Sequence, residues 1–245
     1  MEAQRLKSNL VHGSEPNRRQ RYEKTLQANA AFLTKTVVTR IFRWLIIGTK
    51  IQTRNDMANF ETYSPFLQSW EGGYSNNKND SGGATMCGVT LATWQAYCRS
   101  HKLTGTKETL RHMSKEQWAD IMKTGYWDAV WGDHIHSQSV ACMLADWAVN
   151  AGPKRAVKGV QVAFPDIKAD GVMGPVTLSR INAANPVVLF AKLRESRLVY
   201  YETLAKNSKK QATFLNGWTA RVKAIRYGAL VCNDKQHTKI EWLEH

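Results

Sequence analysis

The sequence lacks an apolar run long enough to cross a bilayer, and it lacks a recognisable export signal. A membrane-spanning helix needs about 20 apolar residues, whereas the one apolar run in the N-terminal leader covers residues 44–47. A secretory signal would also need a small-residue cleavage site, and none is evident. We therefore expect no transmembrane segment, and we expect the chain to be cytoplasmic when it is synthesised.

Metal-binding and cofactor motifs are missing as well. The H-x-H pair at His134 and His136 has no third ligand in its surroundings, and neither a Gly-rich phosphate loop nor a Ser-His-Asp order stands out. We expect no metal and no cofactor. No C-x-x-C motif occurs, so we expect free thiols at all four cysteines, which are Cys87, Cys98, Cys142 and Cys232.

Acidic residues are few relative to basic ones. The 245-residue chain has 34 Lys/Arg and 20 Asp/Glu, a formal net charge of +14. This excess favours a polyanionic partner, which could be nucleic acid, an anionic membrane or a bacterial envelope. Residues 1–56 contain 11 Lys/Arg and 4 Asp/Glu, a net of +7. They could form a basic binding arm or a loosely structured extension, and the position of Met57 leaves open whether they precede the natural start codon.

From residue 57 onward, apolar residues recur at helical spacing, so the predicted fold class is mainly α. Ser64-Pro65 is a predicted helix start, Thr90 and Ser137 are predicted N-caps, and Ser114 with Gln117 is a predicted capping box. Pro186 should open a long amphipathic helix that ends near residue 207, and residues 214–227 should form the last helix. A short β-hairpin fits within residues 72–90.

The stretch "WEGGYSNNKNDSGGATMCGVT" combines one glutamate, Glu71, with a polar, glycine-rich loop. The neighbouring Trp70 and the end of a predicted helix both favour the protonated carboxyl of Glu71. Asp80 follows nine residues later in a polar loop, where it should stay ionised. Carboxyl groups in contrasting environments are typical of sugar hydrolysis. The spacing by itself also fits a solvated surface loop.

This stretch resembles the opening motif of glycoside hydrolase family 108, the bacterial and phage N-acetylmuramidases. The resemblance runs in the family's order over about residues 58–227, and its further motifs are Tyr126-Trp127-Asp128, Asp146-Trp147-Ala148-Val149-Asn150-Ala151-Gly152-Pro153, Asp170-Gly171-Val172-Met173-Gly174-Pro175-x-Thr177-Leu178 and Phe214-Leu215-x-Gly217-Trp218-x-x-Arg221-Val222. It implies a lysozyme-like helical fold and cleavage of the glycan strand of peptidoglycan. The chain departs from the common family form at Met86-Cys87, where polar residues are frequent.

The resemblance implies that Glu71 is the catalytic glutamate. Asp80 and Thr85 occupy positions similar to an Asp and a Thr of phage lysozymes. There Asp80 would activate a water or steady the transition state, and Thr85 would hold that water. The structural alternative for Asp80 is a turn-capping carboxylate.

Three further residues are candidates for substrate binding. Trp127 and Asp128 could line the sugar groove, although Trp127 could equally pack in the core between helices. Asn150, like Asp146, could orient the N-acetyl groups of the substrate, or simply cap and stop its helix.

The resemblance also implies an organisation of the chain and its partner. We expect a basic extension at 1–56, a muramidase catalytic region at 57–152, an integrated helical peptidoglycan-binding region at 153–232 and a tail at 233–245. The partner would be peptidoglycan, reached through a holin or a secretion-associated membrane protein. Two alternatives are a catalytically inactive peptidoglycan-binding protein and, in a different class, a basic nucleic-acid-binding protein. A muramidase has its own reason to be basic, because bacterial envelopes are anionic, and no nucleic-acid motif is recognisable.

Overall fold

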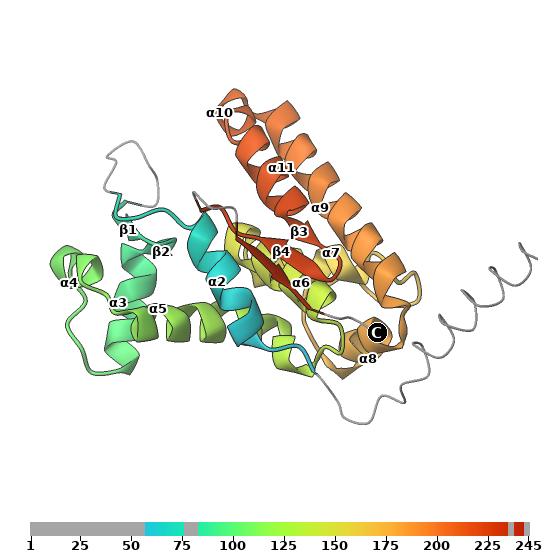
Figure 1. Cartoon of the computed structure of the whole chain (residues 1–245), viewed down its shortest axis with the longest axis horizontal. Helices are drawn as coiled ribbons and strands as arrows, with labels where there is room; N and C mark the ends of the chain where they lie inside the picture. Colours follow the sequence, from blue (N-terminus) through green and yellow to red (C-terminus); the bar gives the residue numbers. More distant parts are fainter. Residues whose placement is uncertain (1–56, 76–82, 235–237, 243–245) are drawn as a thin grey trace, which may run out of the picture. The chain divides into compact units, whose positions relative to one another are not determined.

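The computed structural model describes residues 57–75, 83–234 and 238–242, which are mainly helical (Figure 1). The predicted fold class is therefore confirmed. The α-helices are α2 (Phe60–Trp70), α3 (Leu91–Ser100), α4 (Lys107–Arg111), α5 (Lys115–Met122), α6 (Gln138–Ala151), α7 (Pro153–Gln161), α8 (Pro175–Ala183), α9 (Pro186–Asn207), α10 (Lys209–Ala212) and α11 (Leu215–Ala224). Between α5 and α6 the chain forms a π-helical turn and two 3-10 turns, η1 (Lys123–Trp127), η2 (Asp128–Val130) and η3 (Gly132–His134).

Most predicted helix starts coincide with observed caps. The Thr90 side chain accepts a hydrogen bond from the backbone N–H of Thr93 at the start of α3. Ser114 and Gln117 form the expected capping box of α5. Ser137 caps α6, and α9 begins at Pro186 as predicted. These starts agree because a cap is a local interaction between residues two or three apart.

The predicted start at Ser64-Pro65 is wrong. Helix α2 begins at Phe60, where the Asn59 side chain accepts from the backbone N–H of Thr62 at 2.8 Å, and Pro65 lies inside the helix. Phe60 and Tyr63, in the turn before Pro65, are both buried. Their burial stabilises that turn and offsets the backbone hydrogen bond that proline cannot donate.

The expected hairpin is present. Strands β1 (Thr85–Met86) and β2 (Val89–Thr90) pair antiparallel, with Thr85 opposite Thr90. Cys87 and Gly88 connect them with φ angles of +46° and +78°. Two successive positive φ values are typical of the tight turn that suits the twist of a two-residue hairpin.

The sequence pattern did not predict a second, three-stranded antiparallel sheet. It is formed by β3 (Ile225–Arg226), β4 (Ala229–Val231) and β5 (Lys239–Glu241) in that order. The last helix consequently ends at Ala224 instead of residue 227. Strands of two or three residues are too short to show an alternating pattern, so the sequence carried no signal for them.

The core is built around α6, whose residues Gln138 to Ala148 are all buried. Helices α7 and α9 and the turn η1 pack against it. Such a helix presents a nearly apolar surface in every direction, as expected for a helix surrounded by protein. Asp146, near its C-terminal end, is a charged exception with no exposed surface. Within the described residues, no helix has the length and apolar character needed to cross a membrane.

Candidate active site

Glu71 lies at the C-terminal end of α2, where it serves as the C-cap. Its backbone N–H donates to the carbonyl oxygens of Leu67 at 3.2 Å and Gln68 at 3.3 Å. Its side chain is 13% exposed. The backbone hydrogen bonds hold the residue at a defined point, and its side chain is largely but not fully buried.

The β1–β2 hairpin covers part of this carboxyl. A Cβ added at Gly88 would lie 2.8 Å from Cδ of Glu71 and would overlap the carboxylate, so only glycine fits there. The hairpin turn is held in place by Trp118 of α5, whose Nε1–H donates to the carbonyl oxygen of Cys87 at 2.9 Å. The glycine-rich stretch thus brings the backbone directly against Glu71.

Arg221 of α11 contacts the same carboxyl from the other side. Its Nη1–H donates to Oε1 of Glu71 at 2.7 Å, although the two residues are 150 positions apart in the chain. The Arg221 side chain is 8% exposed. Its remaining donors point to Asp146, with Nη2 at 2.8 Å and Nε at 3.0 Å from Oδ1. A single guanidinium therefore connects Glu71 to the centre of the core.

Asp146 is the buried anion of this network. Arg197 Nη2 lies 2.7 Å from its Oδ2, and the Tyr63 hydroxyl donates to Oδ1 at 2.9 Å. Burial by itself would raise the pKa of Asp146, but the charges of Arg221 and Arg197 and their hydrogen bonds lower it from 3.8 to about 2. Burial opposes the charge of Arg221 too, yet Asp146 and Glu71 hold the pKa of Arg221 well above its ordinary value. The two carboxylates, Glu71 and Asp146, are matched by two guanidinium groups, those of Arg197 and Arg221. Such pairing is the condition for keeping ions in a protein interior.

Two further side chains lie close enough to Glu71 to respond to its charge. Burial raises the pKa of Cys87 and that of Tyr126, and in both cases the negative charge of Glu71 raises the pKa further. Cys87 belongs to the hairpin turn, and Tyr126 belongs to η1. The surroundings of Glu71 therefore combine a thiol, a phenol, a guanidinium and a glycine turn.

Of the two residues proposed to assist Glu71, one can be located. Thr85 lies on β1, half-buried, and exchanges two backbone hydrogen bonds with Ser75 at 2.8 and 2.9 Å. It belongs to the same hairpin that covers Glu71. Asp80 falls between Ser75 and Gly83, outside the described residues.

Of the three substrate-binding candidates, Trp127 is buried, and Asp128 and Asn150 are exposed. Trp127 has no exposed surface, since it stacks on Tyr63 with ring centroids 5.8 Å apart and donates from Nε1 to Asp133 at 2.6 Å. Its position matches the core-packing alternative. Asp128 is exposed and forms an ion pair with Lys123 at 2.6 Å. Asn150 is also exposed.

The amide of Asn150 donates from Nδ2 to the carbonyl oxygen of Asp146 at 3.2 Å, an interaction within the last turn of α6. The structure thus brings Glu71 together with the Thr85 hairpin, while the side chain of Trp127 lies in the core.

Sequence reasoning did not single out Gly88, Tyr126 and Arg221 as parts of this site, although each occurs in a motif that carries the family resemblance. It considered Asp146 only for substrate orientation or helix capping. The motifs pointed to segments of the chain. They did not show which side chain of each segment would face Glu71, because contacts across 150 residues leave no local signal.

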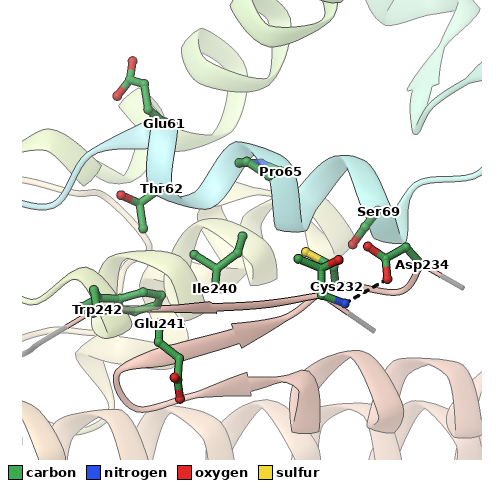
Figure 2. Close-up of a pocket in the computed structure, with 10 residues that line it drawn as sticks. Glu61, Thr62, Pro65, Ser69, Cys232, Asp234, Ile240, Glu241 and Trp242 are labelled. Carbon is green, nitrogen blue, oxygen red and sulfur yellow. Dashed lines mark hydrogen bonds between the residues drawn. The ribbon is translucent and has the colours of Figure 1, made fainter. Parts of the chain in front are cut away.

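A groove of about 430 Å³ lies between α2 and β5 (Figure 2), and Glu71 is not among its lining residues. Pro65 and Ile240 give it an apolar floor, and Glu61, Asp234 and Glu241 contribute acidic side chains. No group of three His, Cys, Asp or Glu side chains in the described parts of the chain could hold a metal ion.

Two family models match adjoining parts of the chain. The model of the family described as Glycosyl hydrolase 108 matches residues 65–152, and that described as Predicted Peptidoglycan domain matches residues 150–223. Glu71, Gly88 and Asp146 lie in the first match, and Arg221 lies in the second. The network around Glu71 therefore draws on both regions.

A solved structure, that of SagA from Brucella abortus, is similar to the chain. The two sequences are 32% identical, the TM-score is 0.58, and the alignment covers 68% of this chain and 90% of SagA. No curated protein sequence matches the chain.

Proposed function

Because the chain belongs to the glycosyl hydrolase 108 family and carries a predicted peptidoglycan-binding domain, we propose that this glycoside hydrolase is an N-acetylmuramidase. Its substrate would be the glycan strand of peptidoglycan, cut at the β-1,4 bond between N-acetylmuramic acid and N-acetylglucosamine. The observation that supports this most directly is Glu71, whose carboxyl lies against the Gly88 turn and Arg221 while its side chain stays 13% exposed.

In this proposal Glu71 is the general acid that protonates the glycosidic oxygen. After proton transfer the carboxylate remains beside Arg221, whose charge stabilises it. The hydrogen bond from Arg221 to Oε1 also fixes the direction in which the carboxyl points. Arg221 is thus a positioning residue for Glu71.

The second role in the reaction is assigned to Asp80 and Thr85. Asp80 would activate the attacking water or steady the oxocarbenium-like transition state, and Thr85 would hold the water by a hydrogen bond. Support comes from the hairpin, since Thr85 shares it with Gly88, which contacts Glu71. Asp80→Asn, with Asn77→Asp three positions earlier as a control, tests the role: turnover should fall by about 10²-fold in the first variant.

We further propose that the enzyme is synthesised in the cytoplasm and reaches the wall through a holin or a secretion-associated membrane protein. Trp127, Asp128 and Asn150 stay candidates for substrate contact. For Trp127 such contact would require the ring to leave the core, so Asp128 and Asn150, which are exposed, are the better-placed of the three.

The proposal is tested by digesting purified peptidoglycan with the full chain and determining the new reducing ends by mass spectrometry. We expect N-acetylmuramic acid at these ends. Glu71→Gln should lower turnover by about 10²-fold or more, because Gln cannot supply a proton. Glu61→Gln is a matched control, since Glu61 is an exposed residue of the same helix. Reducing ends of N-acetylglucosamine, or an active Glu71→Gln protein, would contradict the proposal.

A further inference from the structure

One face of α11 extends from the candidate active site toward α10. Arg221 points from this helix to Glu71. Residues three, four and seven positions earlier lie on the same side of a helix, and here they are Trp218, Gly217 and Phe214. Phe214 has helical backbone angles as the N-cap of α11. With a rise of about 1.5 Å per residue, the face runs about 10 Å from Arg221 to Phe214.

Of the two aromatic residues on this face, Trp218 is half-buried and Phe214 is exposed. Trp218 stacks on buried Tyr201 with centroids 4.9 Å apart and an angle of 24° between the rings. Phe214 lies against Trp218 at 5.8 Å and is itself 52% exposed. A large apolar ring that is exposed yet held by a second ring is a preformed contact surface, and flat aromatic faces suit sugar rings.

Gly217 lies between these aromatic residues on the helix surface. A Cβ added there would meet no atom within 4 Å, so the packing of the protein does not require glycine. Glycine is unfavourable in a helix relative to alanine. Its use at an open helical position fits a place where a ligand approaches the backbone closely.

The segment of the chain that carries this face is basic. Between Glu202 and Asp234 the sequence contains no acidic residue. Helix α10, which lies at the end of the hairpin formed by α9 and α11, contributes two exposed lysines, Lys209 and Lys210 (Figure 1). The other exposed basic residues of this segment are Lys206, Lys223 and Arg226. Such a surface attracts a polyanion.

We propose that these residues hold the peptidoglycan strand beside the bond that is cleaved. The α11 strip, defined as Phe214, Gly217 and Trp218 with Lys209 and Lys210, contacts the polymer in two ways. Its aromatic residues and glycine take a sugar ring, and its lysines pair with carboxylates of the stem peptides. The assignment rests on the proposed function, and it names the surface through which the predicted peptidoglycan-binding domain acts.

Binding is measured in a Glu71→Gln background, so that the polymer stays intact, by sedimentation with purified insoluble peptidoglycan. Phe214→Ala should weaken binding by about fivefold, the effect of one lost ring contact. Lys209→Glu with Lys210→Glu should weaken it by about tenfold at low ionic strength, and by less as salt screens the charges. The matched controls are Leu103→Ala, an apolar side chain that is 48% exposed, and Lys107→Glu with Lys115→Glu. The controls should bind as the parent does.

A second readout separates this inference from the proposed function. With Glu71 intact, Phe214→Ala should raise KM on polymeric peptidoglycan and leave kcat on a short soluble muropeptide within about twofold. Circular dichroism and thermal unfolding confirm that each variant is folded. If the strip variants bind and cleave as the wild type does, or if the controls lose as much binding, the strip is not the binding surface. That result would leave cleavage at Glu71 unaffected, whereas a wrong product would contradict the muramidase assignment instead.

Discussion

Arg221 connects two carboxylates whose surroundings differ. Glu71 has one guanidinium partner, a glycine turn against it and a side chain that is 13% exposed. Asp146 has two guanidinium partners, the Tyr63 hydroxyl and no exposed surface. The difference separates two tasks. Asp146 is a fully buried anion that orients Arg221, whereas Glu71 keeps some exposed side-chain surface, which its proposed role as proton donor requires.

The largest effect on this comparison should come from removing the buried charge. Asp146→Asn leaves Arg221 and Arg197 without their counter-charge in the interior, so we expect the free energy of unfolding to fall by about 3–5 kcal/mol. Urea denaturation followed by fluorescence measures this change. Asp128→Asn removes an exposed carboxylate paired with Lys123, and it should cost about 1 kcal/mol or less. Equal losses in the two variants would show that burial does not distinguish them.

A pH titration of stability gives the next largest effect. The pKa of Asp146 is about 2 in the folded protein and 3.8 as an ordinary value. Because the folded pKa is lowered, this carboxylate stabilises the fold above about pH 4, and the contribution disappears as the pH falls toward 2. The loss should be about 2 kcal/mol, from a shift of nearly two units at 1.36 kcal/mol per unit. The decline should be absent from Asp146→Asn, provided that this variant is folded at pH 5; the same decline there would assign it to other groups.

Replacing Arg221, which contacts both carboxylates, by lysine should have a smaller effect. Arg221→Lys keeps the charge, but a single ammonium cannot bond to Glu71 and to both oxygens of Asp146 as the guanidinium fork does. We expect turnover of peptidoglycan to fall by about tenfold because Glu71 loses its fixed orientation. Arg226→Lys, an exposed arginine just beyond α11, is the control. Full activity in Arg221→Lys would mean that charge alone is sufficient and that the forked geometry is not needed.

The roles of Glu71 and Asp146 also differ in how far the sequence could predict them. Glu71 was predicted to be the catalytic glutamate because its E-G-G stretch resembles the family's motif, whereas the spacing by itself also fits a solvated surface loop. For Asp146 the sequence left two roles open, substrate orientation or helix capping. The structure shows a third, an ion network with Arg197 and Arg221, which come 51 and 75 positions later in the chain.

The motif Tyr126-Trp127-Asp128 shows the same limit on a smaller scale. The sequence left a groove position and a core position open for Trp127. Trp127 is buried, and its neighbour Tyr126 is the residue whose pKa responds to the charge of Glu71. The π-helical turn η1 followed by the 3-10 turn η2 sets which side chain points inward. These irregular turns alter the helical period, so a prediction based on regular spacing cannot give the direction of each side chain.

By itself, the sequence determined the mainly helical class, the caps of α3, α5 and α6, and the β1–β2 hairpin. All of these depend on residues that lie a few positions apart, where propensity, capping and turn geometry act directly. Only the tertiary structure decided that Arg221 contacts Glu71, that the same arginine pairs with buried Asp146, and that β5 pairs with β4. Those contacts form when helices and strands distant in the chain pack together, because the burial that stabilises them depends on the assembled core and not on any single segment.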